Sequence, residues 1–292
     1  MSQFFKYSLV FSLLVSLSIS SEAIQVIDDA GQVVDIQVPA KRIITLAPYL
    51  TELVYSAGAG KQLIATVSFS DFPQTATTLP VVGDANGIDI ESVMAMKPDL
   101  VLSWLSGNGT AITSKLANLG IRVFQSEPQS IDDISSTILR IGKLAGTEQT
   151  AANNNAKFKD AIYTLQRKYS RLKRVPVFYQ FWDKPIYTIG ATHLISRQIE
   201  LCGGVNIFAD QDVLTLNVNI ESILNKDPAV IIASGETHAR PQWLEQWNDW
   251  KSITAVRNNN LYSIPPELIQ RHSVRITQGM ELICRYINSA RD

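Results

Sequence analysis

The chain is poor in cysteine and histidine, and neither sign of charge dominates. Its 292 residues include two cysteines and three histidines, and 26 basic side chains are balanced by 27 acidic ones. No polybasic run occurs, so nucleic acid is not an expected partner. Beyond the N-terminus, no apolar run is long enough to span a membrane. Hydrophobic residues, by contrast, make up 46% of the chain, which is enough for a sizeable core.

The two cysteines are Cys202 and Cys284. Neither has a histidine or a second cysteine at the spacing of a zinc ligand set, so a metal site is not expected. In an exported protein an isolated pair is more often a disulfide, and this one would close a loop of about 80 residues. Two free buried thiols are the alternative.

The N-terminus has the layout of a secretory signal. Lys6 supplies a positive charge, residues 7–19 are mainly apolar, and Ser21 and Ala23 are small residues of the kind that signal peptidase reads. We therefore expect residues 1–23 to be a cleavable signal peptide, cut after Ala23, and the mature chain to be a soluble periplasmic protein. An uncleaved membrane anchor is the alternative, but the apolar stretch is short for one.

Strands and helices alternate along most of the mature chain. Residues 24–40 are predicted to form a hairpin, and a buried strand at 43–46 ends at Pro48. Further along, Asp89 is predicted to cap a helix that precedes a strand at 100–102. This alternation indicates βαβ units on a mostly parallel sheet.

Between Ser130 and Arg174 the strand signal disappears. Isoleucines recur at helical spacing from Ile131, and a second, more polar helical run covers residues from about 148 to 172. A helix of about 25 residues would be about 37 Å long, enough to bridge two lobes, although an ordinary surface helix is the alternative. The predicted organisation is an N-terminal lobe over 24–145, a connecting helix over 146–173 and a C-terminal lobe over 174–292.

Two distant segments repeat one pattern. Residues 90–102 read IESVMAMKPDLVL, and residues 220–232 read IESILNKDPAVII. Each has a proline seven residues after its glutamate and ends in an apolar strand. The repeat predicts two lobes built on one plan, although chance similarity between helix–proline–strand units is common.

Several segments, taken in order, resemble those of one protein family. They are RIITLAPYLTELVYSAGAG, SFSDFP and MKPDLVLSW in the first half, and ELCGGVNIF, IESILNKDPAVII and RHSVRITQGMELICRYI in the second. The resemblance is to the substrate-binding proteins of cobalamin, siderophore and haem importers, and it spans most of the mature chain. It implies an α/β fold of two Rossmann-like lobes joined by a single long helix, with the ligand in a cleft between the lobes.

Within this family the chain is similar to the cobalamin-binding members. SFSDFPQTA, Trp104 after the PDLV strand and GGVNIF after the first cysteine resemble their motifs, and Cys202 and Cys284 fall where those proteins have a disulfide. Cobalamin is therefore implied as a transported ligand, and no cofactor is expected. Two segments, GDANGIDIE and DQDVLTLNVNIE, lack the tryptophan that such members tend to carry there, so some aromatic walls must differ, or the ligand does.

A corrinoid presents apolar edges and amide arms, so its site should offer flat aromatic surface and a few polar contacts. Open α/β sheets bind ligands beyond the carboxyl ends of their strands. Packing within the core or a loop is the alternative for each aromatic residue. The expected ligand contacts are Pro48, Tyr49, Ser68, Phe69, Trp104, Phe181 and Trp182, with Arg271 as a further candidate near the C-terminus.

Other ligands and functions need different side chains. A ferric siderophore favours an arginine cluster, for which Arg271 and Arg275 are few, and haem iron favours an axial histidine or tyrosine. The three histidines, His193, His238 and His272, are scattered. A secreted α/β hydrolase is an alternative of another class. No helix-opening GxGxxG, GxSxG or HExxH motif occurs, but a catalytic triad assembled in space remains open.

Glu91 and Glu221 occupy the same position in the two repeats, at the start of each predicted helix. Locally, each carboxylate would interact favourably with the helix N-terminus. The resemblance implies a sharper role, in which one glutamate on each lobe docks onto arginines of a dimeric permease with its ATPase subunits. We therefore expect a monomeric receptor that delivers a corrinoid to an ABC importer and is not an enzyme.

Overall fold

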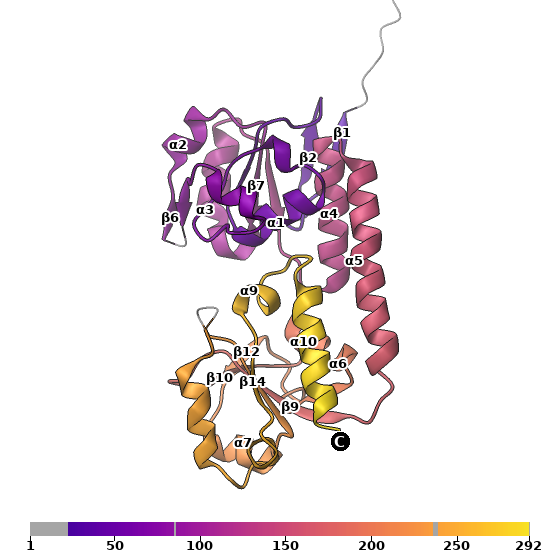
Figure 1. The fold of residues 1–292 in the computed structure, drawn as a ribbon. Coiled ribbons are helices and arrows are strands. Elements are labelled where there is room, and N and C mark those ends of the chain that lie inside the picture. Colours follow the sequence, from indigo (N-terminus) through magenta and orange to yellow (C-terminus); the bar gives the residue numbers. More distant parts are fainter. Residues whose placement is uncertain (1–22, 85, 236–238, 292) are drawn as a thin grey trace, which may run out of the picture.

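The computed structural model describes residues 23–84, 86–235 and 239–291. The expected signal peptide, residues 1–23, lies outside the described residues except for Ala23 itself. Two groups of strands and helices lie one above the other in Figure 1, with a pair of long helices along one side. Within the described ranges no helix has both the length and the apolarity needed to cross a membrane.

The first lobe is built on a four-stranded parallel sheet in the order β4-β3-β7-β8. Its strands are β3 (Ile43–Thr45), β4 (Leu63–Ala65), β7 (Leu100–Trp104) and β8 (Val123–Ser126). The hairpins of this lobe are β1 (Ile24–Ile27) with β2 (Val33–Ile36), as predicted, and β5 (Gly83–Asp84) with β6 (Gly87–Ile88). Its helices are α1 (Pro48–Ser56), α2 (Ile90–Ala95) and α3 (Leu105–Asn118), with 3-10 turns at Gly60–Gln62 and Gln74–Thr78.

The second lobe repeats this arrangement, with a parallel sheet in the order β11-β9-β13-β14. Its strands are β9 (Val175–Gln180), β11 (Gly204–Asn206), β13 (Val230–Ala233) and β14 (Leu261–Ser263), and β10 (Tyr187–Ile189) pairs separately with β12 (Thr215–Asn217). The helices are α6 (Leu194–Leu201), α7 (Ile220–Lys226), α8 (Thr254–Arg257), α9 (Pro266–Ile269) and α10 (Ile276–Ser289), with a 3-10 segment at Gln242–Asp249. In both sheets the strand that comes second in the chain lies at one edge, beside the first. The predicted α/β fold with two sheet-bearing lobes is therefore confirmed.

The sequence repeat corresponds to one structural unit in each lobe. Asp89 caps α2 by accepting a hydrogen bond from the backbone N–H of Ser92 at 3.0 Å, and Asn219 caps α7 in the same way at 2.8 Å. Each helix is followed by a residue with positive φ directly before the proline, Lys97 at 45° after α2 and Asp227 at 38° after α7. The strands that follow, β7 and β13, hold equivalent places in the two sheets, so the repeat marks a shared plan.

Two long helices, α4 (Ile131–Ala145) and α5 (Glu148–Tyr169), lie along the side of the molecule (Figure 1). A capping box formed by Ser130 and Asp133 begins α4, and Gly146, with φ of 67°, ends it. α5 contacts α1 and α4, and it also contacts α6 and α10 of the second lobe. With 22 residues α5 is about 33 Å long. These contacts support the prediction that α5 connects the lobes; the exact lobe boundaries stay a prediction.

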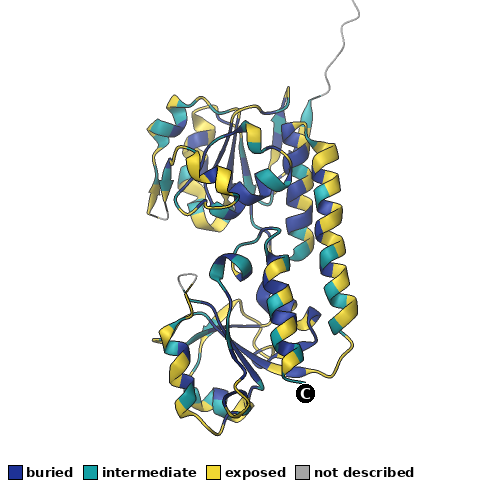
Figure 2. Cartoon of the chain, in the orientation of Figure 1, coloured by how far each residue is buried: buried dark blue, intermediate teal, exposed yellow. Residues whose placement is uncertain are grey.

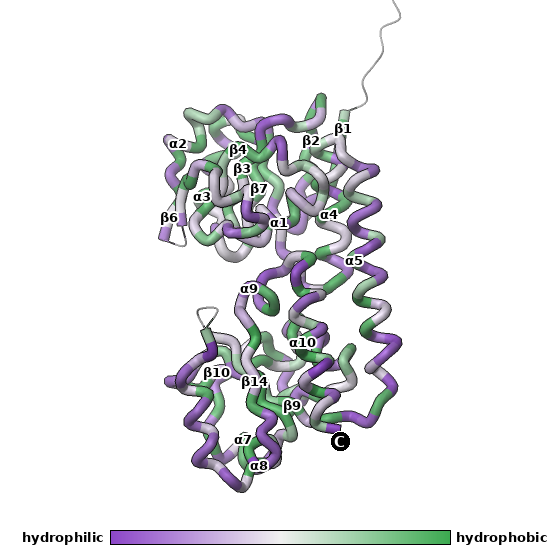
Figure 3. The backbone as a smooth tube through the Cα atoms, viewed as in Figure 1, coloured by the Kyte–Doolittle hydropathy of each residue, from purple (hydrophilic) through white to green (hydrophobic). Residues whose placement is uncertain are grey.

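The hydrophobic core lies on the two central sheets. In Figure 2 the strands are buried while the outer face of α5 is exposed, and Figure 3 shows the same strands as hydrophobic. All four residues of β13 are buried, as are the first four of β7. Parallel strands that are covered on both faces have such continuous apolar runs. The carboxyl ends of these strands therefore extend from a well-packed core.

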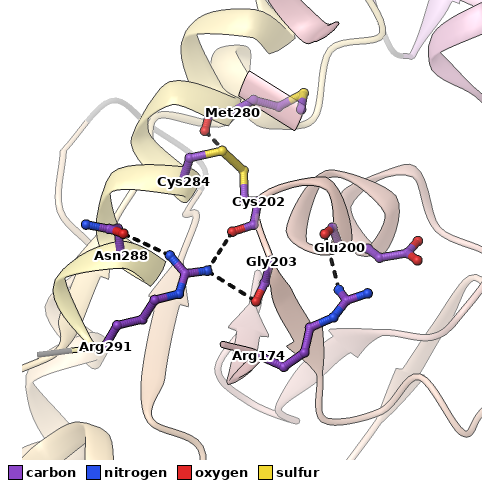
Figure 4. The surroundings of a disulfide bond; sticks show 8 residues. All are labelled: Arg174, Glu200, Cys202, Gly203, Met280, Cys284, Asn288 and Arg291. Carbon is purple, nitrogen blue, oxygen red and sulfur yellow. Dashed lines mark hydrogen bonds between the residues drawn. A yellow bond between two sulfur atoms is a disulfide. The ribbon is translucent and has the colours of Figure 1, made fainter. Parts of the chain in front are cut away.

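Cys202 at the end of α6 and Cys284 in α10 form a disulfide, with their Cα atoms 4.6 Å apart (Figure 4). Arg291 donates hydrogen bonds to the carbonyl oxygens of Cys202 and Gly203, at 3.0 and 3.3 Å. These bonds link the segment after α10 to the end of α6, beside the disulfide. The predicted disulfide is confirmed, and the alternative of two free thiols is wrong.

Candidate functional site

The carboxyl ends of β3, β7 and β8 meet around Tyr49. Pro48 begins α1 shortly after β3, and Tyr49 is buried, with its hydroxyl donating to the carbonyl oxygen of Ser126 at 3.0 Å. The ring of Trp104 approaches Tyr49 edge-on, with the ring centroids 6.2 Å apart. Burial raises the pKa of Tyr49 well above its usual range, so its hydroxyl stays protonated. Tyr49 therefore serves as a support for Trp104 more than as an open surface.

Trp104 combines a fixed position with an exposed ring. Its indole N–H donates to Oε1 of Glu127 at 3.2 Å, and its backbone N–H donates to Oδ1 of Asn108 at 2.7 Å. Asn108 in turn donates to the carbonyl oxygen of Leu46 at 3.0 Å. The Trp104 side chain nevertheless stays 40% exposed. A ring that is held in place but open to solvent is suited to stacking on a flat ligand.

The loop after β4 presents a second aromatic surface. Phe69 is 78% exposed and has φ of 65°, a left-handed conformation that is unfavourable for a bulky residue. Ser68 is half-buried, and its backbone N–H donates to the carbonyl oxygen of Gly83 at 2.9 Å. Phe72 is 40% exposed in the same loop. Exposed aromatic rings on a strained loop are a feature of binding sites.

In the second lobe the candidates follow β9. Phe181 lies beside Tyr179 and Tyr187, with ring centroids 6.4 and 5.9 Å away, and Trp182 is 44% exposed. Both line a pocket of about 500 Å³ together with Trp243 and other residues of the second lobe. Each lobe thus carries exposed aromatic side chains at the carboxyl ends of its strands.

Arg271 lies where the two lobes touch. It belongs to the segment between α9 and α10, which follows β14, and its guanidinium Nη1 lies 2.9 Å from Oε1 of Glu52 and 2.6 Å from Oδ1 of Asp71. Nη2 of Arg271 donates to the carbonyl oxygen of Phe69 at 3.0 Å. The loop after β4 in one lobe therefore contacts the segment after β14 in the other, which brings the carboxyl-end loops of both sheets together.

The two described histidines approach the same junction. His193 caps α6 through Nδ1, which accepts from the backbone N–H of Ile195 at 3.1 Å, and the ring of His272 lies 6.3 Å from that of Tyr49. Burial, and then the charge that His272 carries when it is protonated, lower the pKa of His193 to about 4. Burial also lowers the pKa of His272, although Glu127 opposes this. Both rings are therefore neutral at pH 7.

His238, the third histidine, lies outside the described residues. Within the described part of the chain no group of three or more metal-binding side chains occurs. The hydroxyl of Tyr49 and Nδ1 of His193 are both engaged by protein partners. Because both atoms already form hydrogen bonds within the protein, they are poorly suited to be axial ligands of a haem iron.

Glu91 and Glu221 lie apart from this junction, in the first turns of α2 and α7. Both side chains are exposed, and neither forms a salt bridge within the described ranges. Figure 1 places α2 and α7 at opposite ends of the molecule, one on each lobe. The two carboxylates are thus free to meet a partner that touches both lobes.

Several residues at the junction or beside the exposed aromatic rings were not predicted from the sequence. They are Glu52, Asp71, Phe72, Asn108, Glu127 and Trp243. Asp71 and Phe72 belong to the SFSDFP motif, so the signal that indicated Phe69 extends to them. Asn108 and Glu127 act through contacts with Trp104 that no spacing reveals.

Comparison with known proteins identifies the class. The model of the periplasmic binding protein family matches residues 43–268, and the chain belongs to this family. Its members are substrate-binding proteins, so the prediction of a binding protein is confirmed and the hydrolase alternative is wrong.

Particular relatives are more specific. The vitamin B12-binding protein of Vibrio cholerae serotype O1 is 33% identical over 253 residues, which cover 86% of this chain and 91% of the relative. The crystal structure of the periplasmic vitamin B12-binding protein BtuF of Vibrio cholerae matches with a TM-score of 0.77 and 32% identity, over 87% of this chain and 99% of that one. The haem-binding protein RhuT of Roseiflexus sp. RS-1, at 16% identity and a TM-score of 0.75 over 87% and 100%, shares the fold alone.

Proposed function

We propose that this protein captures cobalamin or a related corrinoid between its lobes and delivers it to the permease of an ABC importer. The observation that carries the proposal is that Phe69, Trp104 and Trp182 stay exposed at the carboxyl ends of strands in both lobes. Such flat apolar surfaces suit the face and edges of a corrin ring. The relatives named for vitamin B12 binding support the same ligand.

Calorimetric titration of the mature protein with cyanocobalamin, haemin and a ferric siderophore tests the ligand. We expect saturable binding of cyanocobalamin and weaker or no binding of the other two. Binding of haemin alone, or of the siderophore alone, would contradict the proposal.

A variant of Trp104 tests the site. Trp104→Ala removes a fixed, exposed ring and should weaken cyanocobalamin binding by about 10- to 100-fold, the usual cost of losing an aromatic anchor. Trp250→Ala is a matched control, because Trp250 is similarly exposed, at 36%, but ends the 3-10 segment and not a sheet strand. Equal effects of the two substitutions would count against the assigned site.

The proposed docking contacts are Glu91 and Glu221, one on each lobe. Replacing both by alanine should abolish uptake of cyanocobalamin by cells, since the carboxylates would no longer meet cationic groups of the permease, while leaving ligand binding normal. Glu148→Ala, which removes an exposed charge from the first turn of α5, serves as the control. Normal uptake by the double variant would rule out this role.

The remaining parts of the proposal concern the mature protein. We infer a periplasmic monomer that begins after Ala23, and mass spectrometry of the exported protein gives its N-terminus directly.

The proposed ligand contacts remain Pro48, Tyr49, Ser68, Phe69, Trp104, Phe181, Trp182 and Arg271. Among them Tyr49 is buried and Arg271 is engaged by two carboxylates, so their contribution is expected to be indirect.

A further inference from the structure

The segment between α9 and α10 carries two arginines, and both meet carboxylates. Arg271 pairs with Glu52 and Asp71, as described above. Nη1 of Arg275 lies 3.5 Å from Oε1 of the same Glu52, and its Nη2 lies 3.7 Å from Oε1 of Glu267. Both guanidinium groups at the junction of the lobes are therefore neutralised by acidic partners.

The charge of this cluster is balanced or negative. Three carboxylates, those of Glu52, Asp71 and Glu267, face the two guanidinium groups of Arg271 and Arg275. The positive charges would therefore not outnumber the negative ones even if Glu52 bound a proton. Burial raises the pKa of Glu52, against hydrogen bonds from Ser273 and Arg271 that lower it. Burial also acts to raise the pKa of Asp71, but the hydrogen bond and charge of Arg271 outweigh it and hold that pKa below its usual range. Asp71 is therefore ionised at neutral pH.

The cluster lies next to the exposed aromatic surface of the first lobe. Asp71 stands between Phe69 and Phe72 in the chain, and the guanidinium of Arg275 lies 4.6 Å from the centroid of the Phe72 ring. The Asp71 side chain is 41% exposed, whereas that of Glu52 is 1% exposed. A ligand that stacks on these rings would therefore meet Asp71 first among the charged partners of Arg271.

We propose that Asp71, with Glu52 behind it, is a specificity determinant that prevents Arg271 from attracting anionic iron chelates. A ferric tris-catecholate is a trianion, and its recognition needs cations that are not already paired. A corrinoid such as cyanocobalamin is uncharged overall and gains from apolar contact instead. The inference rests on the proposed function, since it assigns the excluded ligand class of the same site.

The test compares two ligands on matched variants. Cyanocobalamin and ferric enterobactin, a trianionic tris-catecholate, are titrated into the wild type, Asp71→Asn, Asp71→Glu and Asp160→Asn. Asparagine leaves an acceptor for Arg271 but removes the charge, and glutamate keeps the charge. Asp160→Asn makes the same chemical change on the exposed surface of α5.

We expect Asp71→Asn to shift the ratio of the two affinities toward ferric enterobactin by about five- to tenfold, as one charge acting on a trianion would. Added salt should reduce the shift. Asp71→Glu and Asp160→Asn should keep the wild-type ratio. An equal ratio in Asp71→Asn and Asp160→Asn, or tight binding of ferric enterobactin by the wild type, would overturn the inference. The wild-type titration with cyanocobalamin decides the proposed function separately.

Discussion

Removing the disulfide between Cys202 and Cys284 should cost about 4.5 kcal/mol of unfolding free energy in the oxidised protein. The bond joins positions 82 residues apart. For a loop of that length the chain-entropy model gives about 15 cal/mol/K, or about 4.5 kcal/mol at 25 °C. Both side chains are fully buried. Alanine is therefore a better replacement than serine, whose buried hydroxyl would need a hydrogen-bond partner.

Urea unfolding of the wild type and of the Cys202→Ala/Cys284→Ala double variant, followed by far-UV circular dichroism, measures this cost. Cyanocobalamin affinity should change less than in Trp104→Ala, because the disulfide packs within the core of the second lobe, whereas Trp104 belongs to the first. A loss of stability below about 1 kcal/mol would refute the entropic reasoning.

Three further outcomes are expected. Because the pKa of His193 is lowered from 6.5 to about 4, stability should fall as the pH drops below about 6.5, by about 2 kcal/mol at pH 5, and His193→Asn should flatten this urea-unfolding profile. Ser130→Ala removes the capping box of α4 and should cost about 1 kcal/mol in the same assay. Gly190→Ala should lower the thermal midpoint by several degrees, since its Cβ would lie 2.2 Å from the carbonyl oxygen of Val213.

The lobes were predictable from sequence because each is encoded by local chemistry. In both repeats an Asx side chain caps a short helix, a proline follows shortly after the helix, and an apolar strand comes next, so the unit can be predicted without knowledge of the fold. α3 was missed for the opposite reason. It begins with LSGNGT, which reads as a loop, and its backbone leaves helical geometry at Gly109, with φ of 73°. The β10–β12 pair was not predicted because each strand has only three residues and the two strands are far apart in the sequence.

The exposed aromatic residues near the strand ends were also predictable, because they closely follow apolar strands, and their contact with a ligand stays a prediction. The charged junction was not, since it joins Arg271 to Glu52 across 219 positions. In the structure every residue of α1 from Tyr49 to Val54 is buried, so the carboxylate of Glu52 has no route to solvent. A buried carboxylate needs a cation or several hydrogen-bond donors. Only the packing of the two lobes shows that Glu52 is buried and that the cation beside it is Arg271.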